Sequence, residues 1–227
     1  MNPQAAMNAS NPSVQGPHRG SLLKTAGEPL ERARSAMLMI HGRGASAEDI
    51  LSLALELNVA GFACLAPQAV NNTWYPNPFH TPLAENEPWL SSALDRMDEV
   101  IAAIGKAGIP PERTFLLGFS QGACLALEYA ARHARRYGGL AGLSGALIGP
   151  DNLPRNYAGS LDGTPVFLGC SDMDPYVPKE RVEAATRVLQ SLGGRVTQRL
   201  YPKMGHVVNP DEIEFVRGLM QAGLARP

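Results

Sequence analysis

The chain has 227 residues, a net charge of −1 and 44% hydrophobic residues. This length and composition are typical of one soluble globular domain and exclude a disordered or fibrous chain. The charge is near zero and forms no basic block, so nothing favours nucleic acid or an anionic membrane as a partner. The three cysteines all lie in apolar runs, which argues against a disulfide framework and predicts a reducing, cytoplasmic location.

The N-terminal residues differ from the rest in composition. Residues 1–20 are rich in Asn, Pro and Ser and lack the apolar stretch of a secretory signal, so we expect a poorly ordered tail there. His18 in this tail and His80 in a later loop are expected at the surface. Residues 21–227 are expected to form a single domain, and the absence of any run of about 18 apolar residues predicts no membrane span.

Strand-like and helix-like patterns alternate along the chain. An opening strand or extended arm is expected at residues 21–30, and later strands are expected at residues 36–40, 62–66, 114–117, 140–144, 165–169 and 195–201. Helical spacing of apolar residues follows Ser46, covers 90–104, 121–130 and 179–192, and resumes after the N-cap Asn209. This order predicts an α/β fold with a mainly parallel sheet and helices on both faces.

A long segment, residues 71–88, interrupts the alternation of strands and helices, and we call it the aromatic segment. It is rich in Pro and Asn and carries Trp74, Tyr75 and Phe79. Long loops within a compact domain are usually functional or mobile. Two interpretations remain open: the aromatic side chains line a substrate pocket beside the site, or they anchor the loop to the core.

The central motif is Gly118-Phe-Ser120-Gln-Gly122, which lies between a predicted strand and a predicted helix. A sharp strand-to-helix turn of this kind exposes a serine hydroxyl, and its flanking glycines let strand and helix approach closely. The sequence therefore predicts Ser120 as a nucleophile.

A nucleophilic serine needs a base and an orienting acid, which follow it in the order Ser, Asp, His in α/β-hydrolases. His206 is the histidine downstream of the turn that follows a predicted strand, so it is the expected base. Asp172 and Asp174 both follow the strand at 165–169, and we favour Asp174 as the acid, with Asp172 organising the loop.

Backbone N–H groups are expected to stabilise the oxyanion. One comes from Gln121, the residue after the nucleophile, and one from Arg43 in the turn after the strand at 36–40. His41 in this turn is expected to hydrogen-bond the backbone.

The chain resembles the phospholipase/carboxylesterase family of α/β-hydrolases, which includes the acyl-protein thioesterases. Four motifs carry the resemblance in order: Ile-His-Gly-Arg-Gly from Ile40, Gly-Phe-Ser-Gln-Gly-Ala from Gly118, Asp-Met-Asp-Pro-Tyr-Val-Pro from Asp172, and Met-Gly-His ending at His206. The resemblance implies an α/β-hydrolase fold without a large cap domain and hydrolysis of esters or thioesters without cofactor or metal. It also implies that Asp174 is the acid, and it leaves open a homodimer that covers the site.

The leading hypothesis is a serine carboxylesterase that acts on short- to medium-chain small-molecule esters through an acyl-enzyme on Ser120. An acyl-thioesterase or lysophospholipase with the same triad is the alternative, and a non-catalytic binding protein is a third hypothesis. Two departures from the family argue against a lipidated-protein substrate: Arg43 replaces a common Leu and places a positive side chain near the acyl entrance, and the aromatic segment differs. Substrate-pocket residues are expected in this segment and beside the acid and the base: Trp74, Tyr75, Phe79, Met173, Tyr176 and Val207.

Overall fold

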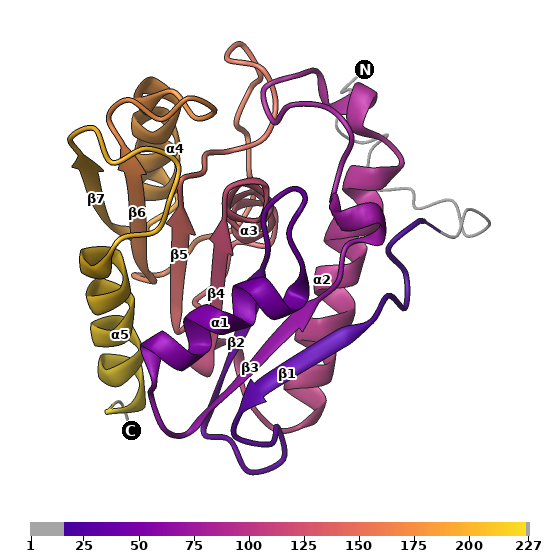
Figure 1. The fold of residues 1–227 in the computed structure, drawn as a ribbon, viewed down its shortest axis with the longest axis vertical. Coiled ribbons are helices and arrows are strands. Elements are labelled where there is room, and N and C mark those ends of the chain that lie inside the picture. The colour runs from indigo at the N-terminus through magenta and orange to yellow at the C-terminus, as the bar shows by residue number, and fades with distance from the viewer. Residues whose placement is uncertain (1–15, 226–227) are drawn as a thin grey trace.

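A seven-stranded sheet forms the centre of the computed structural model, which describes residues 16–225 (Figure 1). The strand order is β1-β3-β2-β4-β5-β6-β7; β1 pairs antiparallel with β3, and the other neighbours pair in parallel. The strands are β1 (Leu23–Gly27), β2 (Ser35–Ile40), β3 (Phe62–Pro67), β4 (Thr114–Phe119), β5 (Gly139–Leu143), β6 (Pro165–Ser171) and β7 (Arg195–Tyr201). The predicted α/β fold with a mainly parallel sheet is confirmed.

Helices cover both faces of the sheet (Figure 1). They are α1 (Ala47–Leu57), α2 (Trp89–Lys106), α3 (Gln121–Arg132), α4 (Lys179–Ser191) and α5 (Pro210–Leu224). Successive side chains of a strand point to opposite faces. In β2, Met37 and Met39 therefore belong to the core cluster that includes residues of α1 and α5, whereas Leu38 and Ile40 belong to the cluster that includes residues of α2, α3 and α4. Within the described residues, no helix is both long and apolar enough to cross a membrane.

Two helix starts agree with the sequence signals. Ser46 caps α1 and exchanges hydrogen bonds with Asp49, and Asn209 caps α5 and exchanges them with Glu212. Each pair satisfies N–H groups that the first helical turn leaves without partners. The caps matter for the site because Ser46 follows the turn after β2 and Asn209 follows His206.

Residues 17–20, the last part of the expected tail, form a turn against the domain. His18, expected at the surface, is fully buried, and its Nε2–H donates to the Trp74 carbonyl at 2.9 Å while Nδ1 accepts from the Val70 N–H. Burial lowers the pKa of His18, which keeps the ring neutral and allows this pair of bonds. Residues 1–15 lie outside the described residues.

Candidate active site

The turn between β4 and α3 has the strained backbone expected of a nucleophile. Ser120 has φ 54° and ψ −120°, an uncommon conformation for a residue with a side chain. Glycine is required on both sides of it: a Cβ on Gly118 would collide with the Gly122 carbonyl, and one on Gly122 would collide with the Ile40 carbonyl. This packing of strand, helix and β2 holds the serine at the carboxyl edge of the sheet.

Ser120, His206 and Asp174 form one chain of hydrogen bonds. Ser120 Oγ lies 2.8 Å from His206 Nε2, and His206 Nδ1 lies 2.7 Å from Asp174 Oδ2. An ionised carboxylate only accepts hydrogen bonds, so Nδ1 carries the proton and Nε2 is free to accept from the serine hydroxyl. This is the tautomer that general-base catalysis requires.

The Asp174 carboxylate is held in one orientation by the loop that follows β6. Its side chain is fully buried, and Oδ1 accepts from the N–H groups of Tyr176 and Val177 at 2.9 and 3.0 Å. The Cys170 thiol lies 3.8 Å from Oδ2. Burial raises the pKa of Cys170 to about 12, so the thiol stays neutral beside the carboxylate. Oδ2 is thus directed at the histidine.

The other candidate acid, Asp172, points elsewhere. Its Oδ1 accepts from the Lys203 N–H at 2.8 Å, in the turn that leads to His206. Ser171 Oγ accepts from the N–H groups of Met173 and Gly205 at 3.2 and 3.3 Å, so it also joins the two loops. Asp172 therefore organises the loops, whereas Asp174 contacts the imidazole.

A buried carboxylate lies behind the histidine loop. Glu212 is fully buried; Oε2 accepts from the Asn209 N–H, and Oε1 accepts no hydrogen bond from the described residues. Burial raises the pKa of Glu212 from 4.5 to about 7. Between pH 4.5 and about 7 the folded state therefore keeps a proton that the unfolded state has released. The free energy of unfolding falls as the pH rises through this range.

Glu212→Gln is expected to remove this pH dependence, because an amide keeps the cap but does not ionise. The variant should be more stable than the parent at pH 8, by up to roughly 3 kcal/mol, and lose this advantage at pH 5. Urea denaturation at both pH values measures the difference. Glu214→Gln, at an exposed acid on the same helix, is the control; an equal effect of Glu212→Gln at both pH values would contradict the prediction.

The turn after β2 supplies the second expected oxyanion donor. His41 is buried, its Nδ1–H donates to the Gly42 carbonyl at 2.8 Å, and Nε2 accepts from the Ala69 N–H at 3.1 Å. Burial lowers the pKa of His41, which favours the neutral ring that both bonds need. Its bonding to the backbone agrees with the prediction. In the part of the chain that the structure describes, the N–H groups of Arg43 and Gln121 donate to no protein atom.

The aromatic segment lies against the core. Trp74 and Tyr75 are fully buried and Phe79 nearly so, and the indole N–H of Trp74 donates to the His41 carbonyl at 2.9 Å. The structure thus favours anchoring of the loop over a pocket lined by these three residues. The Arg43 guanidinium, expected near the acyl entrance, donates to three carbonyls of this segment.

The other three expected pocket residues have exposed side chains. Met173, Tyr176 and Val207 are 67%, 68% and 51% exposed, which is unusual for large apolar side chains. The Tyr176 ring contacts His206 edge-on, with centroids 4.9 Å apart, and the Phe119 ring lies 5.1 Å from His206. Tyr176 and Phe119 thus lie beside the histidine, whereas Met173 and Val207 are exposed at positions next to Asp174 and His206 in the sequence.

The side chains of Thr73 and Gln121 make contacts that no sequence motif predicts. Gln121 Oε1 accepts from the Trp74 N–H at 2.9 Å, and Gln121 Nε2 donates to the Tyr75 carbonyl at 2.8 Å. Thr73 Oγ1 lies 3.3 Å from Gln121 Oε1. No local pattern indicates these contacts, since they join residues 46 to 48 positions apart.

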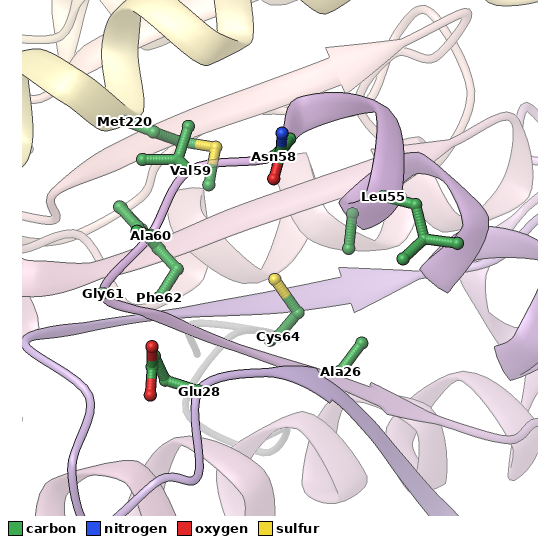
Figure 2. A pocket seen from close by; sticks show the side chains of 12 residues that line it. Ala26, Glu28, Leu55, Asn58, Val59, Ala60, Gly61, Phe62, Cys64 and Met220 are labelled. Carbon is green, nitrogen blue, oxygen red and sulfur yellow. The ribbon is translucent and has the colours of Figure 1, made fainter.

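A separate recess of about 250 Å³ lies at the opposite, amino-terminal edge of the parallel strands (Figure 2). It opens between the end of α1, the start of β3 and α5. Its wall is mainly aliphatic, and Glu28 and Cys64 are its ionisable residues. Burial raises the pKa of Cys64 to about 11, so this thiol is a poor nucleophile. The residues that line the recess include no set of nucleophile, base and acid like that of Ser120, His206 and Asp174.

Comparison with known proteins agrees with the geometry. The family model described as Phospholipase/Carboxylesterase matches residues 26–222. A solved phospholipase/carboxylesterase from Dyadobacter fermentans is 43% identical, with a TM-score of 0.85, over 88% of this chain and 96% of that chain.

Curated relatives have two kinds of name. A probable carboxylesterase, SOBER1-like, from Arabidopsis thaliana is 28% identical over 83% of this chain and 79% of its own length. Acyl-protein thioesterase 1 from Gibberella zeae is 34% identical over 52% of this chain, and the match spans about half (51%) of the thioesterase. The curated relatives are thus named as carboxylesterases and as acyl-protein thioesterases.

Proposed function

Because the chain belongs to the phospholipase/carboxylesterase family of α/β-hydrolases, we propose that it is a serine carboxylesterase. Its substrates are short- to medium-chain carboxylic esters of small molecules, and hydrolysis proceeds through an acyl-enzyme on Ser120. The observation that carries the proposal is the hydrogen-bonded chain from Ser120 through His206 to the buried Asp174.

The geometry suits a two-step reaction. His206 Nε2 takes the hydroxyl proton as Ser120 Oγ attacks the ester carbonyl, and Asp174 stabilises the imidazolium. The N–H groups of Arg43 and Gln121 receive the oxyanion. Nε2–H then protonates the departing alkoxide, and an acyl-enzyme remains. Water, deprotonated by His206, attacks this ester, and the carboxylic acid leaves as Ser120 recovers its proton.

Exposed apolar side chains support small, soluble esters as substrates. Tyr176 presents apolar surface beside His206, and Met173 and Val207 are exposed next to Asp174 and His206 in the sequence. Such surface binds the apolar part of an ester by excluding water. The three free cysteines are buried, which fits the cytoplasmic location expected from the sequence.

An acyl-thioesterase is the second candidate, favoured by the relatives named acyl-protein thioesterase 1. The same triad would attack a thioester carbonyl, so its geometry does not separate the two substrates. A non-catalytic binding protein is disfavoured because such a protein has no need of the assembled hydrogen-bonded chain.

The test is reaction with an organophosphonate probe, followed by peptide mapping. We expect one label, on Ser120. A p-nitrophenyl ester series of increasing chain length, compared with thioesters of matched acyl chains, then assigns the substrate class. Faster turnover of short esters supports the carboxylesterase, and faster turnover of the matched thioesters favours the second candidate. Absence of both label and turnover would overturn the proposal in favour of a binding protein.

A further inference from the structure

One backbone carbonyl, that of Tyr75, accepts hydrogen bonds from three side chains. The donors are Arg43 Nη2 at 2.9 Å, Gln121 Nε2 at 2.8 Å and Thr73 Oγ1 at 3.1 Å. Two of them belong to the residues whose backbone N–H groups are the proposed oxyanion donors. These two residues come from different elements, the turn after β2 and the start of α3, and the Tyr75 carbonyl joins their side chains.

The contact of Arg43 is specific to a guanidinium. Besides the Tyr75 carbonyl, its Nη1 donates to the Pro76 carbonyl at 2.8 Å and its Nη2 to the Asn77 carbonyl at 2.9 Å. Three successive carbonyls are thus held by one planar group, which a lysine ammonium on its single flexible stem does not reproduce. The side chain is exposed on its outer side, so these bonds, rather than burial, hold its conformation.

The contact of Gln121 uses both ends of its amide. Oε1 accepts from the Trp74 N–H at 2.9 Å, and Nε2 donates to the Tyr75 carbonyl. The side chain is buried, and a buried amide left without either partner would carry a large desolvation cost. The first residue of α3 is therefore pinned to the aromatic segment.

The segment that receives these bonds is itself anchored. The Trp74 indole N–H donates to the His41 carbonyl, the buried His18 donates to the Trp74 carbonyl, and the Gly44 N–H donates to the Asn72 carbonyl at 2.7 Å. The Tyr75 carbonyl is therefore held in a fixed position, because displacing it would break several buried hydrogen bonds.

We propose that the side chains of Arg43 and Gln121 are positioning residues for the oxyanion hole. By binding the same carbonyl, they set the separation and direction of the two N–H groups before substrate arrives. The aromatic segment thereby contributes to transition-state stabilisation without touching substrate. This inference rests on the proposed function, in which these N–H groups receive the oxyanion.

Arg43→Met and Gln121→Met are the test variants, since methionine keeps the length of the stem and removes the donors. Loss of one oxyanion donor lowers kcat by about 10²–10³, so misalignment is expected to lower kcat by about 10- to 100-fold with KM changed less than about threefold. Arg43→Lys should recover only part of the loss. Because both side chains bind the same carbonyl, their effects should not be independent. The double variant should therefore lower kcat by a smaller factor than the product of the two single-variant factors.

The inhibition constant of a trifluoromethyl ketone distinguishes positioning of the oxyanion hole from a general structural role. Its adduct with Ser120 places an oxyanion in the hole, so its inhibition constant should rise in proportion to the fall in kcat/KM across the variants. Arg217→Met is the matched control: Arg217 also binds two backbone carbonyls, of Glu56 and Leu57 at 2.8 and 3.1 Å, far from the site. Its kcat and inhibition constant should stay unchanged.

Unchanged kcat in both methionine variants, or a loss confined to KM, would overturn the positioning role. Thermal melting identifies a variant that does not fold, and the other variant then decides. Failure of the proposed function has a different signature, since the parent protein would then take no phosphonate label on Ser120.

Discussion

Ser120→Ala is expected to lower kcat/KM for p-nitrophenyl butyrate by about 10⁴- to 10⁶-fold, as for the serine of other triads. The physical reason is that alanine removes the atom that forms the acyl-enzyme. The hydrogen bond from His206 to Asp174, at 2.7 Å, does not involve the serine and should persist. Initial rates of purified parent and variant, with thermal melting of both, measure the effect.

Ser144→Ala is the matched control. Ser144 follows β5, the neighbour of the strand that carries Ser120, and it also has a positive φ, of 51°. Its buried hydroxyl has no hydrogen-bond partner among the described residues. Activity should therefore remain close to that of the parent. Near-parental activity of Ser120→Ala would exclude the proposed nucleophile.

Asp174→Asn is expected to lower kcat by about 10⁴-fold, the size seen for the same change in serine proteases. The amide can keep the N–H bonds of Tyr176 and Val177 through its oxygen. It then presents an NH₂ group to His206 Nδ1, which favours the tautomer with the proton on Nε2. That tautomer cannot accept the proton of Ser120. Steady-state rates on the ester used for Ser120→Ala measure the loss.

Asp172→Asn separates the two acids of this loop. Asp172 accepts one hydrogen bond, from the Lys203 N–H, and an amide oxygen accepts it equally well. We expect kcat to change by less than tenfold. A larger loss in Asp172→Asn than in Asp174→Asn would reverse the assignment of the acid.

The local features of this protein follow from its sequence. Strand-to-helix geometry at Ser120 depends on Gly118 and Gly122, and the caps Ser46 and Asn209 depend on residues three positions away. The alternation of strands and helices leads to a mainly parallel sheet. The loops that carry Ser120, Asp174 and His206 all lie at the carboxyl edge of this sheet. These features rest on short-range spacing and on topology, which a single sequence carries.

The tertiary structure decided which side chains meet across long stretches of chain. Neither the burial of His18 nor the contact of Arg43 with carbonyls 32 to 34 residues away has a local signal. The same holds for the aromatic segment, where composition allowed either a pocket or an anchor and the bond from Trp74 to the His41 carbonyl favours the anchor. Such contacts depend on which polar groups remain without partners once the sheet and helices have packed, and that is determined only in the folded molecule.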